Sequence, residues 1–186
     1  MRRRAALAAV ALVALSGCTA DAEEPRSEPQ ASTLVACPDQ PDTAAKGADL
    51  MPALTLDCPG GGTVDLGRAP GVPTLVNLWA TWCPPCRGEL PLLQQFAEEA
   101  GDDVRVIGVI SKDGEPQAES FADEIGIGFP SAFDGEGELM GELGLNVLPF
   151  TYFLDADGGL VHTEVGEVGS VEELRGLVAE HLGVQL

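Results

Sequence analysis

Two cysteines, Cys83 and Cys86, are separated by two prolines and stand between a strand pattern and a helix pattern. Residues 73–81 are apolar and β-branched, which predicts a buried strand, and residues 84–100 predict a helix. The first cysteine therefore lies beside the free amides and positive dipole end of a helix N-terminus, which stabilise a thiolate. The second lies one turn further on, where it can attack a mixed disulfide. We predict thiol–disulfide exchange, with Cys83 as the exposed nucleophile and Cys86 as the buried resolving thiol.

Other uses of this cysteine pair are a plain structural disulfide or half of a zinc site. A zinc site needs two more ligands, and besides the other cysteines the chain offers only His162 and His181, without the spacing of a zinc finger. A purely structural bridge does not explain the strand and helix around the pair. We therefore expect a redox pair and neither a metal nor a cofactor.

The N-terminus has the pattern of an export signal. Three arginines precede an apolar stretch at residues 5–15, which is too short to cross a bilayer as a stable helix. The next residues, Leu-Ser-Gly-Cys ending at Cys18, resemble the bacterial lipobox, whose cysteine is lipidated and becomes the first mature residue. A short uncleaved anchor or a plain signal peptide is the alternative. We predict a lipoprotein signal peptide at residues 1–17 and a lipid-anchored protein on the outer face of the cell membrane.

Export changes what the other cysteines can do. With Cys18 lipidated, four cysteines remain, and an even set outside the cytoplasm can all be oxidised. Three pairings are open. The close spacing of Cys83 and Cys86 favours that pair, which leaves Cys37 with Cys58. This second bridge is either structural or a relay that passes electrons to the first.

Charge and composition limit the kinds of partner the protein can bind and indicate where its folded domain begins. The chain has 30 acidic against 10 basic residues, a net charge of −20, so we expect no nucleic-acid partner. Residues 18–36 are rich in Ala, Glu, Pro and Ser and predict a flexible tether. We expect one domain at residues 37–186, with its core at about 50–183, and a monomer.

Apolar periodicity and turn residues predict the remaining elements. Short runs around a glycine triplet predict a hairpin at residues 54–56 and 63–66. We expect strands at 104–110, 150–154 and 160–165, a short extended segment at 129–133, and helices at 115–126, 136–143 and 170–182. This order predicts an α/β fold, in which helices flank a central mixed sheet.

Residues 77–91, NLWATWCPPCRGELP, resemble the active-site segment of the thioredoxin superfamily. The likeness is to its TlpA/ResA-like branch of membrane-anchored extracytoplasmic oxidoreductases, and it covers roughly residues 50–183. The resemblance implies a thioredoxin fold, here with an N-terminal β-hairpin extension. It also identifies Trp82 with the family's tryptophan before the first cysteine and Pro91 with its helix-kinking proline.

The resemblance assigns further site residues. Leu148 and Pro149 fall at the family's cis-proline loop, where an incoming substrate chain pairs as a short strand. Asn77 replaces thioredoxin's buried aspartate and cannot titrate, whereas Glu89 falls where the ResA-like branch carries a glutamate near its cysteines. Our hypothesis is that Glu89 shuttles protons for Cys86 or modulates its pKa; a solvated helix glutamate is the alternative.

The resemblance also implies a function. A membrane-anchored thiol–disulfide oxidoreductase would reduce disulfides of exported proteins, apocytochrome c among them, with electrons from a membrane thiol transporter of the CcdA/DsbD kind. The same cysteines would serve an exported disulfide oxidase. A copper metallochaperone, with the pair as soft ligands and His162 as an additional one, belongs to a different class. We discount a peroxidase, because Ala80 stands where peroxiredoxins have a threonine.

Overall fold

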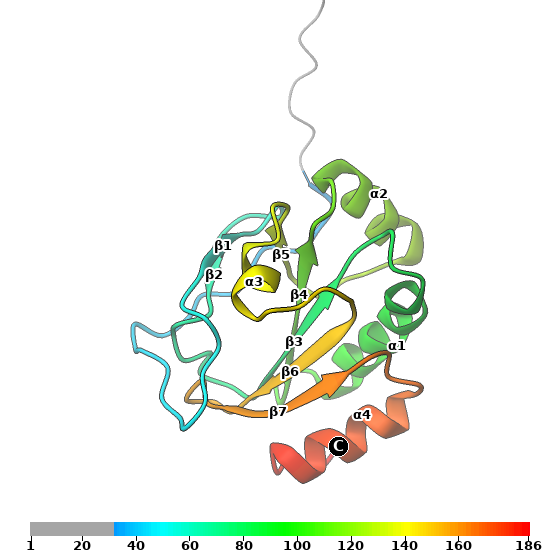
Figure 1. The fold of residues 1–186 in the computed structure, drawn as a ribbon. Coiled ribbons are helices and arrows are strands. Elements are labelled where there is room, and N and C mark those ends of the chain that lie inside the picture. Colours follow the sequence, from blue (N-terminus) through cyan, green and yellow to red (C-terminus); the bar gives the residue numbers. More distant parts are fainter. Residues whose placement is uncertain (1–31) are drawn as a thin grey trace, which may run out of the picture. The chain divides into compact units, whose positions relative to one another are not determined.

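The computed structural model of the chain describes residues 32–186 (Figure 1). The predicted signal peptide, Cys18 and most of the predicted tether lie outside these residues. Within them, no helix combines the length and the apolar character that a membrane crossing requires.

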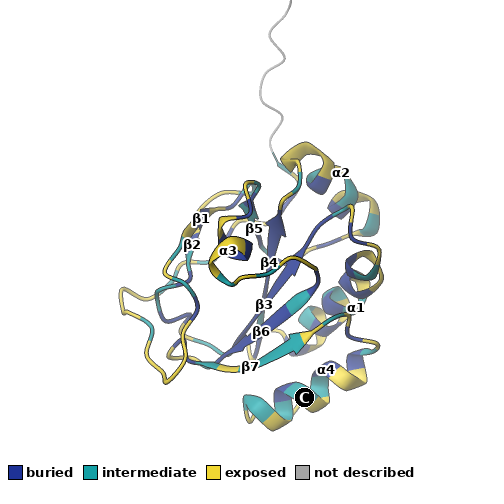
Figure 2. Ribbon diagram, viewed as in Figure 1, coloured by how far each residue is buried: buried dark blue, intermediate teal, exposed yellow. Residues whose placement is uncertain are grey.

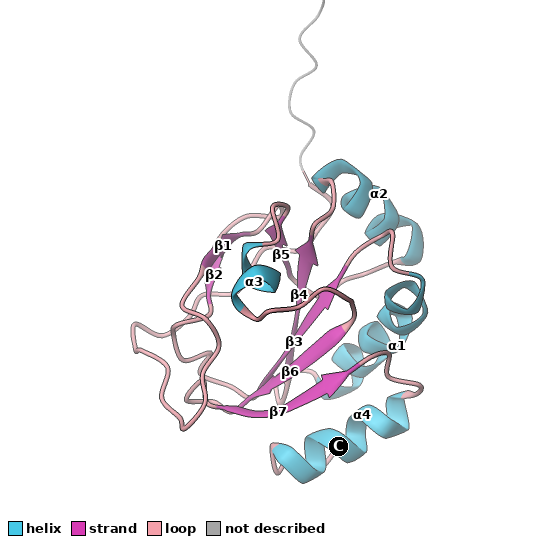
Figure 3. Cartoon of the chain, in the orientation of Figure 1, coloured by secondary structure: helices cyan, strands magenta, loops and turns pink. Residues whose placement is uncertain are grey.

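Five strands form a central sheet in the order β5-β4-β3-β6-β7 (Figure 3). The middle strand β3 (Thr74–Trp79) pairs in parallel with β4 (Arg105–Ser111) and antiparallel with β6 (Phe150–Leu154). On one side β5 (Ser131–Asp134) continues the parallel part, and on the other β7 (Leu160–Val165) continues the antiparallel part. The predicted mixed sheet is confirmed.

Four helices flank this sheet: α1 (Pro84–Ala100), α2 (Glu115–Ile125), α3 (Glu138–Glu142) and α4 (Val171–His181). Helix α1 has the predicted bounds because both of its ends carry local signals. Pro84 and Pro85 occupy its first two positions, where an amide has no partner within the helix. Gly101, with a φ of 51°, ends it.

Strand β3 is buried along its whole length (Figure 2). Most of the surrounding core is apolar, but Asn77 on β3, Thr151 on β6 and Glu89 on α1 each have 0% exposed surface. A buried polar group costs free energy unless it is hydrogen-bonded, so these three side chains need partners.

A small hairpin precedes the sheet and contacts it at β5. Its strands β1 (Thr55–Asp57) and β2 (Thr63–Asp65) pair antiparallel, as the sequence predicts. A disulfide joins Cys58, the residue after β1, to Cys37, and the Cα atoms of the two lie 5.9 Å apart. The bridge therefore fixes the segment before the hairpin to the hairpin itself.

The segment before the hairpin is more ordered than the sequence indicates. Residues 37–50, for which no element is predicted, meet the rest of the domain through isolated β-bridges to Arg68 and Gly159. Leu34 falls within the predicted tether, yet only 5% of its surface is exposed. Packing thus begins a few residues earlier than expected, because single bridges and one buried leucine leave no periodic pattern to read.

Replacing Cys37 and Cys58 together with alanine should lower the free energy of unfolding by about 3 kcal/mol, because the bridge closes a loop of 21 residues in the unfolded chain. Urea denaturation without reductant measures this loss. The matched control is the double alanine variant of Cys83 and Cys86, whose loop of 3 residues should contribute less. A structural bridge leaves thiol exchange at the other pair intact; loss of that exchange with unchanged stability would instead indicate an electron relay.

Candidate active site

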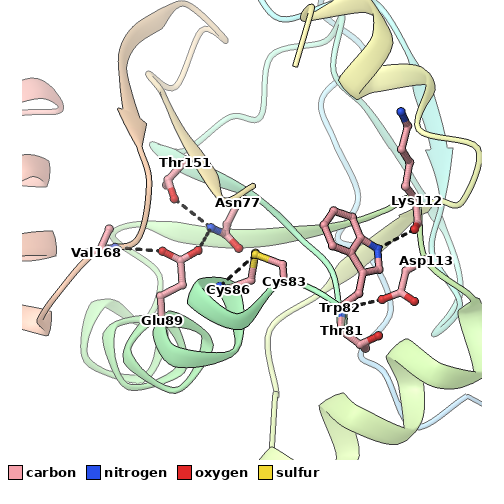
Figure 4. The surroundings of a disulfide bond; sticks show 10 residues. All are labelled: Asn77, Thr81, Trp82, Cys83, Cys86, Glu89, Lys112, Asp113, Thr151 and Val168. Carbon is pink, nitrogen blue, oxygen red and sulfur yellow. Dashed lines mark hydrogen bonds between the residues drawn. A yellow bond between two sulfur atoms is a disulfide. The ribbon is translucent and has the colours of Figure 1, made fainter. Parts of the chain in front are cut away.

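The junction of β3 and α1 carries the second disulfide (Figure 4). Cys83 is the N-cap residue of α1, with extended backbone (φ −95°, ψ 103°), and it is bonded to Cys86 with a Cα–Cα distance of 5.3 Å. The backbone N–H of Cys86 donates to Sγ of Cys83 at 3.2 Å. The sulfur thus takes the place of an N-cap oxygen, and a thiolate formed there meets the positive end of the helix dipole.

The exposure of the pair differs from the prediction. Cys83, expected to be exposed, has only 3% of its surface accessible, and Cys86 has 0%. The reason is that the disulfide ties Sγ of Cys83 to a neighbour that is fully buried. The exposed residue is the preceding Trp82, with 52% of its surface accessible.

A loop after β4 fixes the residues just before Cys83 (Figure 4). Oδ2 of Asp113 accepts a hydrogen bond from the backbone N–H of Thr81 at 2.5 Å, and the carbonyl of Lys112 accepts one from Nε1 of Trp82 at 2.8 Å. Sequence reasoning missed both loop residues. The signal that could find them is their place directly after β4, because β3 and β4 are parallel and end at the same edge of the sheet.

Glu89 lies three residues beyond Cys86 on α1 and has no exposed surface. Its Oε1 accepts from Nδ2 of Asn77 at 2.8 Å, and its Oε2 accepts from the backbone N–H of Val168 at 3.1 Å. Nδ2 of Asn77 also donates to Oγ1 of Thr151 at 3.0 Å, its partner across the β3–β6 pair. The alternative of a solvated helix glutamate is wrong. Sequence reasoning named Asn77 but missed Thr151 and Val168, for which the sequence holds no local signal.

Burial raises the pKa of Glu89 from 4.5 to about 7. The hydrogen bonds from Asn77 and from the Val168 amide act in the opposite direction, while the negative charge of Glu167 adds to the increase. A carboxyl group with a pKa near neutrality can accept and release a proton at physiological pH. The site therefore holds a buried acid–base group one helical turn from the cysteine pair.

The remaining predicted positions lie before β6. The peptide bond between Leu148 and Pro149 is cis, the conformation that the resemblance implies. The carbonyl of Pro149 accepts from the backbone N–H of Gly166 at 3.1 Å. Leu148 is 9% exposed, whereas the preceding Val147 is 56% exposed.

His162 does not join the cysteines. Its ring stacks on that of His181, with centroids 3.9 Å apart, and its Nε2 lies 3.2 Å from Oε2 of Glu164. In residues 32–186 no three His, Cys, Asp or Glu side chains are grouped so as to hold a metal ion. His162 is thus not the additional copper ligand that a metallochaperone would require.

Together these features define a class: thioredoxin-fold proteins with a cysteine pair at the N-terminus of the helix that follows the central strand. The family can be named more closely. The chain belongs to the Redoxin family, whose sequence model matches residues 46–178.

Individual relatives agree with this assignment. The chain is 38% identical over 101 residues to the thiol:disulfide interchange protein DsbE of Vibrio cholerae, which covers 54% of this chain and 53% of that protein. It is 32% identical over 124 residues to the thioredoxin-like protein YneN of Bacillus subtilis, covering 65% and 72%. The chain thus spans about half the length of the DsbE proteins that it matches. These relatives confirm the predicted resemblance and agree with the predicted enzyme class.

A solved structure agrees as well. The secreted Mycobacterium tuberculosis disulfide oxidoreductase homologous to E. coli DsbE superposes with a TM-score of 0.58 at 25% identity, covering 69% of this chain and 96% of that one. This similarity confirms the predicted thioredoxin fold.

Glu89→Gln should remove a pH dependence of stability. The folded-state pKa of about 7 lies above the unfolded value of 4.5, so between them the folded protein binds more protons and the free energy of unfolding falls as pH rises. Glutamine keeps the acceptor for Asn77 but does not titrate. The wild type should lose on the order of 2–3 kcal/mol more than the variant between about pH 5 and pH 8, measured by urea denaturation. Glu180→Gln, at an exposed position of α4, is the control. Equal pH slopes for the wild type and Glu89→Gln would contradict this assignment.

Proposed function

We propose that this protein is a thiol–disulfide oxidoreductase that acts on protein disulfides through Cys83 and Cys86. The observation that carries the proposal is the hydrogen bond from the Cys86 amide to Sγ of Cys83 at the start of α1, because a thiolate at Cys83 would keep this bond. The names of the DsbE relatives support the same chemistry.

The reaction then has two steps. The thiolate of Cys83 attacks a substrate disulfide, forming a mixed disulfide and releasing one substrate thiolate. The sulfur of Cys86 next attacks Sγ of Cys83, which releases the second substrate thiolate and leaves the Cys83–Cys86 disulfide. Glu89 accepts the Cys86 proton in the second step, and its pKa of about 7 suits this role because the proton can then leave to solvent.

Charges around the pair favour the reductive direction. A protein disulfide is a strong oxidant when the reduced form of its cysteine pair, with its thiolate, is stabilised relative to the disulfide. Glu89, three residues beyond Cys86 on α1, is a buried carboxyl group, and the charge that acts on it is that of Glu167, a second carboxylate. Negative charge disfavours a thiolate, so the dithiol is a better electron donor. We propose exported protein disulfides, apocytochrome c among them, as substrates and a membrane thiol transporter of the CcdA/DsbD type as the electron source.

We propose that Trp82 and the Leu148–Pro149 segment form the binding site for the substrate polypeptide. Trp82 and Val147 supply exposed apolar surface next to residues of the site, while the sulfur atoms are buried. A polypeptide that pairs with the backbone of this segment would therefore cover apolar side chains as it approaches Cys83.

Cys86→Ser should trap the mixed disulfide at Cys83, because no resolving thiol is left to release the substrate. Diagonal gels without reductant would show these adducts, and Cys83→Ser, as control, should show none. Adducts in equal amounts with both variants would refute the mechanism. The reduction potential then decides the direction: a value of about −270 mV supports a reductase, and one of about −120 mV would make the protein an oxidase.

We further propose that lipid on Cys18 holds the protein to the outer face of the membrane. The arginines, the short apolar stretch and the Leu-Ser-Gly-Cys sequence support this, as do two disulfides, which persist in oxidising compartments. Cys18→Ser should move the protein from the membrane to the soluble fraction of lysed cells, with Cys37→Ser as the control. Retention of the Cys18 variant in the membrane would contradict lipid anchoring.

A further inference from the structure

Asn77 is fully buried, and in the oxidised protein only the nitrogen of its side-chain amide forms hydrogen bonds within residues 32–186. Nδ2 donates to Oε1 of Glu89 and to Oγ1 of Thr151. Oδ1 is buried too, yet it accepts no hydrogen bond from any part of the chain that the structure describes. A buried acceptor without a donor costs free energy, so the unpaired oxygen calls for a physical explanation.

The direction of the amide group indicates where a donor would come from. In Figure 4 the nitrogen of Asn77 points toward Glu89 and Thr151, and the oxygen points toward the sulfur atoms of Cys83 and Cys86. A disulfide has no hydrogen to donate, whereas reduction creates two S–H groups at this place. Reduction of the pair would thus supply the donor that the oxidised protein lacks.

We propose that Oδ1 of Asn77 is the acceptor for the thiol of Cys86 in the reduced protein, so that Asn77 positions this thiol and favours the dithiol state. The proposal rests on the redox function proposed above. Cys86 is the deeper of the two cysteines, with 0% exposed surface against 3% for Cys83, so a protein acceptor has to replace water. Asn77 takes no proton itself; it holds the thiol on one side and the carboxylate of Glu89 on the other.

The proposed hydrogen bond from Cys86 to Asn77 shifts the equilibrium between the dithiol and the disulfide. When two glutathione molecules reduce the pair, the Cys83–Cys86 bond breaks, the glutathione thiols supply two electrons and two protons, and glutathione disulfide forms. The bond from Cys86 to Asn77 exists only on the dithiol side. Removing the acceptor should therefore shift the equilibrium toward the disulfide, by about three- to tenfold for one weak donor.

A direct test measures the S–H stretch of Cys86 by infrared spectroscopy. In the full chain carrying Cys18→Ser and Cys83→Ala, with the Cys37–Cys58 bridge intact, Cys86 is the thiol that contributes. The band should lie below that of a free, unbonded thiol. A band at the free-thiol position would overturn the proposal, and this result does not depend on whether any Asn77 variant folds.

A second test measures the glutathione equilibrium at about pH 5, where Glu89, with a pKa of about 7, is protonated. The carboxyl group bonded to Asn77 is then neutral, and Glu167, which acts on Glu89, is common to all variants. Asn77→Leu removes the acceptor at similar volume and should give the three- to tenfold shift. Thr151→Val removes the other partner of Asn77 but keeps Oδ1, so its equilibrium constant should lie closer to that of the wild type than that of Asn77→Leu does.

The outcomes separate the two proposals. If the wild type does not exchange with glutathione, the proposed redox function fails. If the wild type exchanges and Asn77→Leu has the same equilibrium constant as Thr151→Val, only the role of Asn77 fails.

Discussion

A carboxyl group without exposed surface can stay in a protein core only where donors hold it, and much of this site is arranged around one such group. Glu89 on α1 accepts from Asn77 on β3 and from Val168, just before α4. One side chain therefore ties the central strand, the first helix and the approach to the last helix together. The same burial raises its pKa to about 7, so the contact that organises the core also provides the acid–base chemistry.

Local signals made much of the fold predictable. The bounds of α1 follow from its prolines and from Gly101, and β6 and β7 have the bounds that the sequence predicts. The cysteine pair was predictable for the same reason, because a strand, a short turn and a helix cap are all encoded within one stretch of chain. The partners of Glu89 were not, because Asn77 and Val168 are 12 and 79 residues away in the chain. Only the register of β3 on β6 and the packing of α1 on the sheet bring them together.

The predictions that needed correction, and the contacts that the sequence did not reveal, depend on disulfide bonding and tertiary packing. The exposure of Cys83 depends on a disulfide to a residue at the bottom of the site, which spacing alone does not reveal. The order of residues 37–50 depends on isolated bridges to distant loops. The contacts of Lys112 and Asp113 with the chain before Cys83 depend on two strands ending at one edge. In the last two cases the deciding partner is remote in sequence, and no periodicity marks it.

Strand β7 lies at the border of the sheet, next to β6, and Val161 and Val165 on it are 42% and 65% exposed. Such a border presents backbone amides and carbonyls to solvent and invites a second copy to add its own strand, the first step of many aggregates. Because the chain has a net charge of −20, two copies repel each other electrostatically, which opposes this association. Two approaching copies would bring carboxylates such as Glu164 against one another, and like charges in facing strands oppose pairing. The acidic surface thus protects a sheet border with which no further strand of residues 32–186 pairs.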